Sequence, residues 1–198
     1  MIGEKGKASI HKAAKDLFSK KGVEQISLAA IANGANVDLK AVKKQYGNST
    51  EILREILSEG IEETSRYFQK IVSERGKADL KLTRLVSELL RRYEEHYPLY
   101  KLVSISFESL NDEDLHLRGI LTKEQIDRYR QNTAIIGRLI AQGQSEGLFV
   151  DVDPLETAYL LRGMINATVK YWHIATKGES LASHAGTLMK LFLKALSK

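Results

Sequence analysis

The sequence predicts an all-α protein, and three observations support that prediction. Apolar residues recur at intervals of three or four positions through most of the chain, which is the spacing of a buried helix face. The 198 residues include only 2 prolines and 14 glycines, so few residues interrupt long helices. No two segments of alternating polarity flank a tight turn, as paired strands would. We therefore expect about nine helices and no sheet.

The first expected helix runs from about residue 5 to residue 21. Its apolar residues recur at helical spacing and form one predicted buried stripe, made of Ile10, Ala14, Leu17 and Phe18. Gly22 follows, at the position where a left-handed residue often ends a helix.

Residues 27–46 have the pattern of two short helices joined by a tight turn. Ser27 is placed to cap the first of these helices, and Asp38 is placed to cap the second. Asn36, in the turn, is a residue type that tolerates a positive φ. This pattern, which ends at Tyr46, is typical of a helix-turn-helix, whose second helix enters the major groove of DNA.

The rest of the chain predicts longer and more apolar helices. Asn48 with Glu51, and Asp153 with Glu156, are capping pairs that begin two of them, and Gly147 ends another. The expected helices cover residues 49–75, 79–97, 98–110, 122–146, 153–176 and 180–196.

Composition and charge narrow the class of protein. The chain has no cysteine, which excludes disulfides, and its N-terminus lacks the apolar core of a signal peptide. No apolar run approaches the roughly 18 residues of a membrane span, so we expect a cytoplasmic protein with no membrane partner. Residues 1–53 hold nine lysines and no arginine against five acidic residues, a net charge of +4, whereas residues 54–198 carry +1. This excess indicates a polyanion partner, although a solvated lysine-rich surface would have the same composition.

Residues 7–53 resemble the head of the TetR-type family of bacterial transcriptional regulators. The matching positions are 17–18, Gly22, Ser27, 31–32, 35–38, Val42, Tyr46 and 48–53. Gly163 and Met164, followed by Trp172, are similar to the family's penultimate helix. The family usually has Gly, Tyr and Lys where this chain has Asn36, Lys43 and Ser49, and the last two are positions that contact phosphates.

The resemblance implies a dimeric repressor that binds a palindromic operator and responds to a small effector. It divides the chain into a helix-turn-helix domain, residues 1–53, and a ligand-binding and dimerisation domain, residues 54–198. It implies no cofactor. The departures at Lys43 and Ser49 leave one alternative open, a helical small-molecule-binding protein with a degenerate DNA-binding head.

Helical geometry predicts which side of the recognition helix faces DNA. With Val42 facing the core, Lys40 and Lys44 point outward. Lysine can donate to guanine, Gln45 can pair with adenine, and Ala41 can touch a thymine methyl group. Ser27 and Lys43 would contact phosphates. The predicted DNA-binding residues are Ser27, Asp38, Lys40, Ala41, Lys43, Lys44 and Gln45. The alternative is an ordinary three-helix subdomain with a solvated lysine face.

Dimerisation is expected because one recognition helix covers only a few base pairs. We predict that the last two helices form the interface, through Gly163, Ala167, Leu181, Leu188 and Phe192. A core within a single chain is the alternative for these residues.

The effector site is expected where aromatic residues gather in the C-terminal domain. Aromatic walls with a few polar groups are typical of small-molecule sites, although aromatics at helical spacing also occur in plain cores. The predicted ligand-binding residues are Tyr93, His96, Tyr97, Tyr100, Phe107, Tyr129, Trp172 and His173. Few charges fall on the inward stripes, so an apolar or amphipathic effector is expected.

An enzyme is not expected. Residues 143–147 match the G-x-S-x-G pattern around Ser145, but that nucleophile turn needs a preceding strand, and the sequence predicts a helix there. The histidines lack metal-ligand spacing, so we predict no catalytic residue and no metal site.

Overall fold

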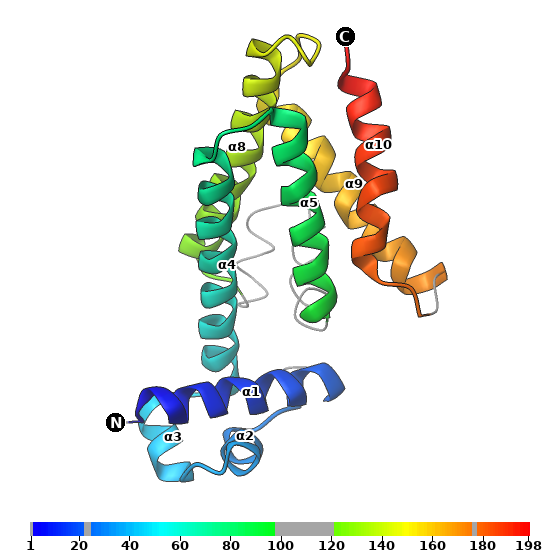
Figure 1. Cartoon of the computed structure of the whole chain (residues 1–198). Coiled ribbons are helices and arrows are strands. Elements are labelled where there is room, and N and C mark those ends of the chain that lie inside the picture. Colours follow the sequence, from blue (N-terminus) through cyan, green and yellow to red (C-terminus); the bar gives the residue numbers. More distant parts are fainter. Residues whose placement is uncertain (1, 22–24, 98–120, 176–177) are drawn as a thin grey trace. The chain divides into compact units, whose positions relative to one another are not determined.

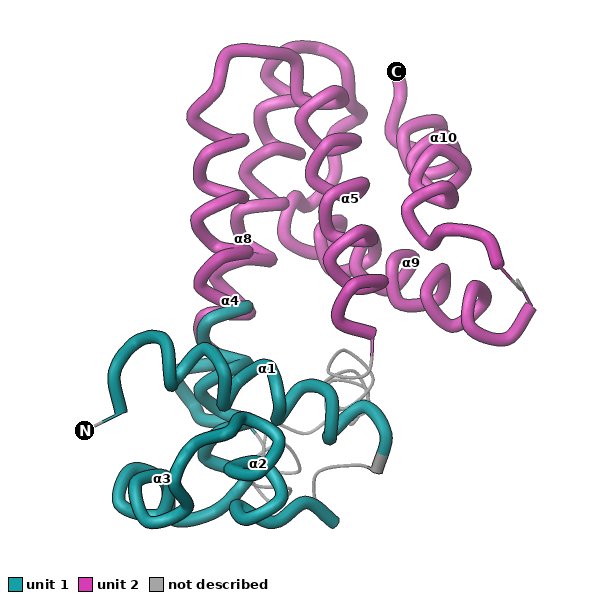
Figure 2. Tube along the Cα trace, turned by 60° about the horizontal axis from the view of Figure 1, so that its bottom comes forward, with its two compact units in different colours: residues 1–60, 98–125 teal, residues 61–97, 126–198 magenta. Residues whose placement is uncertain are grey.

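The computed structural model describes residues 2–21, 25–97, 121–175 and 178–198, and these ranges contain eight α-helices and one 3-10 helix (Figure 1). The chain packs into two compact units (Figure 2). Of the described residues, unit 1 holds 2–21, 25–60 and 121–125. Unit 2 holds 61–97, 126–175 and 178–198. The all-α fold class predicted from the sequence is confirmed.

Unit 1 is built on three short helices and the start of a long one. They are α1 (Glu4–Lys21), α2 (Leu28–Ala35), α3 (Leu39–Gln45) and α4 (Ser49–Ser73), of which residues up to Gly60 belong to this unit. Helix α1 packs on α2, and α2 packs on α3. Burial of apolar side chains stabilises this unit, and six of those described have no exposed surface. These six are Ile10, Ala14, Ile31, Val42, Ile52 and Leu53.

The turn between α2 and α3 is fixed by local chemistry, as predicted. The Ser27 hydroxyl accepts a hydrogen bond from the amide of Ala30 at 3.2 Å, and the Asp38 carboxylate accepts one from Ala41 at 3.0 Å. Between them, Asn36 adopts the left-handed conformation, with φ 53° and ψ 46°. A cap of this kind contributes about 1 kcal/mol, so the turn is specified by residues within it.

Helix α4 begins with the predicted capping pair. Asn48 Oδ1 accepts from the amide of Glu51 at 3.0 Å. The Glu51 carboxylate accepts from the amide of Gly47 at 2.8 Å, one residue earlier than in the standard capping box. The helix ends at Ser73, before Gly76 with φ 144°.

Unit 2 continues from α4 into a helical bundle. It holds α5 (Ala78–Glu95), α8 (Lys123–Ser145) from Ile126 onward, α9 (Pro154–Ala175), a 3-10 helix η1 (Leu181–His184) and α10 (Ala185–Leu196). Helix α5 packs against α9, η1 and α10. The fully buried side chains of unit 2 include Leu82, Leu85 and Leu90 on α5 and Ile136, Leu139 and Ile140 on α8.

The start of the last helix differs from the prediction. One helix was expected over residues 180–196, but its first turn is η1. The carboxylate of Glu94, near the end of α5, accepts from the Ser180 hydroxyl at 2.8 Å and from the amide of Ala182 at 3.4 Å. These long-range bonds hold the turn, and helical periodicity alone does not reveal them.

The link between α8 and α9 depends on two glycines. Gly147, two residues after the end of α8, has a φ of 73°. At Gly143, an added Cβ would lie only 2.1 Å from the ring of Phe149, so the ring packs directly on the helix backbone. The amide of Val150 then donates to Leu196 O at 2.8 Å, which ties the link to the end of α10.

Several predictions lie outside the described residues. These are the glycine cap at position 22, the helix over 98–110, and the ligand-binding roles of Tyr100 and Phe107. Among the helices that the structure describes, none is long and apolar enough to span a membrane.

Candidate functional site

The outer face of α3 carries most of the residues predicted to contact DNA. Lys40, Lys43, Lys44 and Gln45 are exposed, whereas Val42 is fully buried. The orientation expected from helical geometry is therefore the one observed. The remaining predicted contacts are Ala41, which is half-buried, and the exposed caps Ser27 and Asp38.

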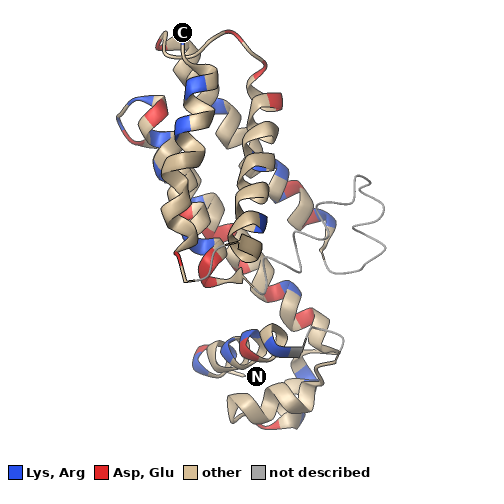
Figure 3. Ribbon diagram, turned by 90° about the vertical axis from the view of Figure 1, so that its right-hand side faces the viewer, with Lys and Arg blue, Asp and Glu red and all other residues tan. Residues whose placement is uncertain are grey.

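The three lysines of this face lack ion-pair partners in the part of the chain that the structure describes. The acidic side chain at the start of α3, Asp38, is engaged in capping the helix. Other lysines lie along α1, as the blue segments of unit 1 show (Figure 3). A surface of this kind attracts a polyanion.

The inner side of α3 is held by a polar network that the sequence did not reveal. Tyr46, the C-cap of α3, is 5% exposed, and its hydroxyl donates to Glu55 Oε2 on α4 at 2.6 Å. The Gln45 amide in turn donates to the Tyr46 hydroxyl at 3.2 Å. The chain of hydrogen bonds therefore runs from a predicted base-reading residue into α4.

Helix α1 joins the same network. Lys7 Nζ lies 2.5 Å from Glu55 Oε1 and 3.5 Å from Glu59 Oε1. The two ring nitrogens of the buried His11 lie 3.2 Å from Glu55 and 3.1 Å from Glu59. The ring therefore lies between the two carboxylates of α4.

His11, Glu55 and Glu59 also have the ligand types of a divalent-metal site, with ligand atoms within 4.8 Å of one another. Lys7 already brings a positive charge to both carboxylates. We therefore interpret this group as an ion-pair network that joins α1, α3 and α4.

The network shifts the proton affinities of its members. Burial acts to raise the pKa of Glu55, but hydrogen bonds from Lys7, Tyr46 and His11 outweigh it and hold the pKa below its ordinary value. Burial, together with the Glu55 carboxylate, raises the pKa of Tyr46. The hydrogen bond to Glu55 raises the pKa of Lys7 against the opposing effect of burial. At neutral pH this combination favours the ionised carboxylate with a protonated phenol and ammonium.

Two of the predicted ligand-binding residues meet at a buried arginine in unit 2. The guanidinium of Arg162, on α9, lies 4.0 Å from the ring centroid of Tyr129 on α8. Tyr93, on α5, has a pKa raised to about 12, chiefly by burial, while the neighbouring Arg162 acts to lower it. Arg162 itself is only 6% exposed.

Sequence reasoning missed Arg162, although a signal was present. It lies one helical turn from Ala158 and Ile165, within the buried stripe of α9. A charged residue inside an apolar stripe is the pattern that would have found it.

Three other predicted residues form a separate aromatic group. The ring of Tyr97 lies 5.3 Å from Trp172 in an edge-on arrangement and 4.7 Å from His173. The indole of Trp172 donates to Glu179 O at 2.7 Å. His96, the C-cap of α5, is exposed.

The residues predicted for the dimer interface separate into two sets. Leu181, Leu188 and Phe192 are at most 5% exposed and belong to the core of the chain itself. Gly163 and Ala167 are exposed on α9. A partner can bury only what a single chain leaves exposed, so the second set is the one available to it.

Helix α9 has apolar residues on two opposite faces. One face is buried in unit 2 through residues that include Ala158, Leu161, Ile165 and Val169. The other face is exposed, and its members, spaced three or four apart, are Leu160, Gly163, Ala167, Tyr171 and Ile174. Leu160 is 63% exposed and Ile174 is 82% exposed. A helix with two apolar faces is typically buried on both.

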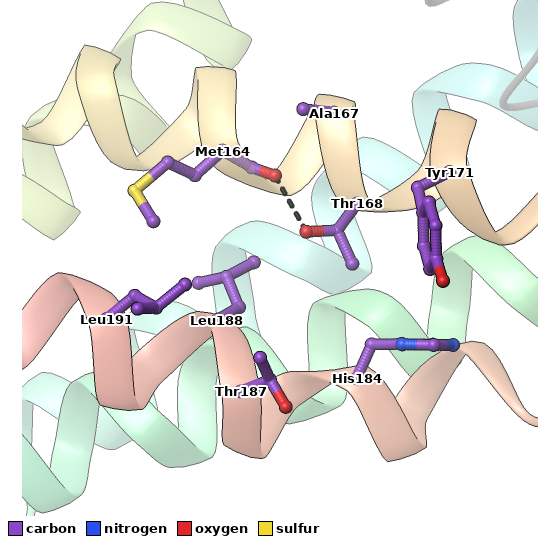
Figure 4. Close-up of a pocket in the computed structure, with 8 residues that line it drawn as sticks. All are labelled: Met164, Ala167, Thr168, Tyr171, His184, Thr187, Leu188 and Leu191. Carbon is purple, nitrogen blue, oxygen red and sulfur yellow. Dashed lines mark hydrogen bonds between the residues drawn. The ribbon is translucent and has the colours of Figure 1, made fainter.

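A groove of about 340 Å³ lies beside this exposed face (Figure 4). Its walls come from α9, η1 and α10, and most of its lining atoms are apolar. The lining residues are Met164, Ala167, Thr168, Tyr171, His184, Thr187, Leu188 and Leu191.

The surroundings of Ser145 do not match a nucleophile turn. This residue ends α8, and its hydroxyl donates to Gln142 O at 2.7 Å, within the same helix. A helix rather than a strand precedes it, so the context that the G-x-S-x-G motif requires is missing.

Comparison with models of known protein families finds no match, and neither does comparison with curated proteins. Solved structures do match. A TetR/AcrR-family transcriptional regulator from Thermobifida fusca shares 24% identity, with 94% of this chain and 96% of that chain covered and a TM-score of 0.74. The transcriptional regulator FadR from Bacillus subtilis, solved with stearoyl-CoA, shares 19% identity, with 94% and 97% covered and a TM-score of 0.75.

A third match is a putative transcriptional regulator from Saccharomonospora viridis, solved with choline. It shares 18% identity, with 99% of this chain and 100% of that chain covered and a TM-score of 0.77. The chain has the fold of the TetR/AcrR family of transcriptional regulators, which confirms at the level of the fold the resemblance that residues 7–53 show.

Proposed function

We propose that this protein is a dimeric, ligand-responsive transcriptional repressor that binds palindromic operator DNA through residues 27–46. The observation that carries the proposal is the outer face of α3, where Lys40, Lys43, Lys44 and Gln45 are exposed and the three lysines are without ion-pair partners among the described residues. In this proposal, residues 1–53 bind DNA, and residues 54–198 bind the effector and form the dimer.

The chemistry of this face suits the major groove. Lys40 and Lys44 would donate to guanine edges, and Gln45 would pair with adenine. Lys43 and Ser27 would hold phosphates and fix the register of the helix. Ser27 and Asp38 already cap their helices. Contacts of these two side chains with DNA would therefore need no change in the backbone of the turn.

A second copy of this chain is the proposed partner of the exposed face of α9. Gly163 and Ala167 lie four residues apart at its centre, and small residues there let a partner helix approach closely. Leu160 and Ile174 flank them and supply apolar area. Two-fold pairing would present two recognition helices to half-sites separated by about one turn of DNA.

We further propose that a small apolar or amphipathic effector binds in unit 2 and lowers affinity for DNA. The aromatic side chains of Tyr93, Tyr97, Tyr129 and Trp172 support this role. Structural relatives bind ligands as different as stearoyl-CoA and choline, so the shared fold does not specify the ligand.

Salt dependence separates this function from the alternative, a small-molecule-binding protein with a degenerate head. Each phosphate contact releases a counterion. A plot of the logarithm of the binding constant against the logarithm of the salt concentration therefore has a slope of about −0.9 for each contact. Anisotropy titrations of genomic fragments at several salt concentrations measure that slope. We expect a slope that corresponds to several phosphate contacts, together with a preferred DNA sequence. Weak binding without sequence preference would favour the alternative.

A further inference from the structure

The carboxamide of Gln45, on the exposed face of α3, is held from its inner side. Its Nε2 donates to the hydroxyl of Tyr46 at 3.2 Å, and that hydroxyl donates to Glu55 Oε2 on α4 at 2.6 Å. The terminal torsion of a glutamine has broad minima, so the carboxamide of an exposed glutamine ordinarily rotates. Here the bond to Tyr46, a residue only 5% exposed, limits that rotation.

Glu55 fixes the direction of these two hydrogen bonds. An ionised carboxylate only accepts hydrogen bonds, and a phenol has a single proton to donate. Because that proton goes to Glu55, the Tyr46 oxygen is left to accept, and it accepts from the NH2 end of Gln45 rather than from the oxygen end. The carboxamide therefore keeps its oxygen and its second N–H for another partner.

Two residues of α1 help to keep Glu55 ionised. Lys7 Nζ lies 2.5 Å from Glu55 Oε1, and His11 Nε2 lies 3.2 Å from Oε2. Burial acts to raise the pKa of Glu55, but the hydrogen bonds that this carboxylate accepts, the one from Lys7 first among them, hold the pKa below its ordinary value. Groups on α1 and α4 thus determine how a side chain on α3 is presented.

We propose that Glu55 is a specificity-determining positioning residue, which acts through Tyr46 to make Gln45 prefer adenine. In the major groove, adenine offers a donor at N6 beside an acceptor at N7, and the oxygen and second N–H of the carboxamide match this pair. Without the inner bond, the carboxamide would rotate and accept other bases. This role rests on the proposed function, since it requires α3 to lie in the major groove, and it adds a residue outside α3 that sets which base is read.

Competition titrations test this role on duplexes that carry the selected operator with each base pair varied in turn. Gln45→Ala first identifies the pair that Gln45 reads, because adenine is no longer preferred there. Tyr46→Phe keeps the ring but removes the hydroxyl. Glu55→Gln supplies an NH2 group that can reverse the direction of both bonds. Each of these two variants should reduce the adenine preference at that pair by about fivefold or more, and leave the other pairs unchanged.

Glu59→Gln is the matched control. Glu59 lies one turn after Glu55 on α4 and faces the same two residues of α1, with Lys7 Nζ at 3.5 Å and His11 Nδ1 at 3.1 Å. This variant weakens the ion pairs with α1 but leaves the bonds among Gln45, Tyr46 and Glu55 in place, so it should keep the full adenine preference. All titrations are made at a temperature at which every variant is folded.

A measurement without DNA tests the inner bond itself. NMR relaxation of the Gln45 side-chain NH2 group, assigned from its loss in Gln45→Ala, reports how freely the carboxamide moves. We expect a restrained group in the unmodified protein and in Glu59→Gln, and a mobile one in Tyr46→Phe.

Two results would overturn the role of Glu55 alone. One is a freely mobile Gln45 carboxamide in the unmodified protein. The other is a selected operator whose adenine preference is unchanged in both Tyr46→Phe and Glu55→Gln. If the unmodified protein selects no sequence at all, the proposed function fails, and the role of Glu55 fails with it.

Discussion

The hydroxyl of Tyr46 donates a 2.6 Å hydrogen bond to the carboxylate of Glu55. Tyr46 is the C-cap of helix α3, and Glu55 lies in the second turn of α4. The bond ties the helix proposed to read DNA to the long helix that follows it. Lys7 and His11 hold the same carboxylate from α1, so three helices meet at one ionised group.

The first prediction concerns this hydrogen bond. Tyr46→Phe keeps the buried ring but removes the donor, and should lower the free energy of unfolding by about 1–2 kcal/mol. Because Gln45 donates to the same hydroxyl, the variant should also relax the sequence preference at the base that Gln45 reads. Urea denaturation and binding to operator variants measure the two effects. Tyr67→Phe is the control, because its hydroxyl makes no hydrogen bond within the described residues. Equal midpoints for the two variants would contradict the prediction.

The second prediction concerns the stability of the fold at low pH. The folded pKa of Glu55 lies below its ordinary value of 4.5, so the unfolded chain binds the proton more readily. The stabilisation is therefore complete above about pH 4.5 and is lost as the pH falls through the folded pKa. Thermal unfolding of Glu55→Gln should show a lower melting temperature at neutral pH and a smaller deficit at low pH. Asp151→Asn, at an exposed carboxylate in the link before α9, is the control. A deficit that stays constant from pH 7 to pH 3 would argue against the network.

The third prediction concerns the lysine face. Lys44→Ala should weaken specific DNA binding by about 1–3 kcal/mol and relax preference at one base pair. Lys43→Ala should weaken binding to all sequences alike and reduce the salt slope by about one contact. Lys70→Ala, at an exposed position on α4 in unit 2, should leave both quantities unchanged. Unchanged affinity in the first two variants would remove these lysines from the interface.

The fourth prediction concerns the dimer. At Gly163, an added Cβ meets no atom within 4 Å in the described chain, so Gly163→Leu should fold and even gain helix propensity. In the dimer, the same side chain would block close approach of the partner helix. Light scattering should therefore give a monomer, or a dimer that dissociates at higher concentration than the unmodified protein. Gly60→Leu is a helical control on α4, where an added Cβ also meets nothing within 4 Å. A dimer of undiminished stability in Gly163→Leu would place the interface elsewhere.

The parts of the fold that could be predicted are those specified by neighbouring residues. Ser27, Asp38 and Asn36 act within a few positions of themselves, so their caps and the turn follow from residue type. The outward lysines of α3 follow from helical geometry once Val42 is placed inside. The start of η1 depends instead on Glu94, which is distant in sequence, and periodicity does not carry that information.

In the candidate sites, too, some features follow from neighbouring residues and others depend on residues distant in sequence. Helical periodicity identified Leu181, Leu188 and Phe192 as one stripe, but it does not tell whether the same chain or a partner covers them. The pairing of Tyr46 with Glu55 and the approach of Arg162 to Tyr129 depend on packing between helices. Such contacts have no local signature, apart from the charge that Arg162 brings into an apolar stripe.

Selection of bound DNA from the genome tests whether α3 reads a specific sequence. The purified protein is mixed at moderate salt with fragments of its own genome, and the bound duplexes are recovered and sequenced. We expect enrichment of a palindrome whose half-sites lie about one helical turn apart, and loss of that enrichment in the Lys44→Ala variant. A correctly folded protein that enriches no sequence would contradict the claim.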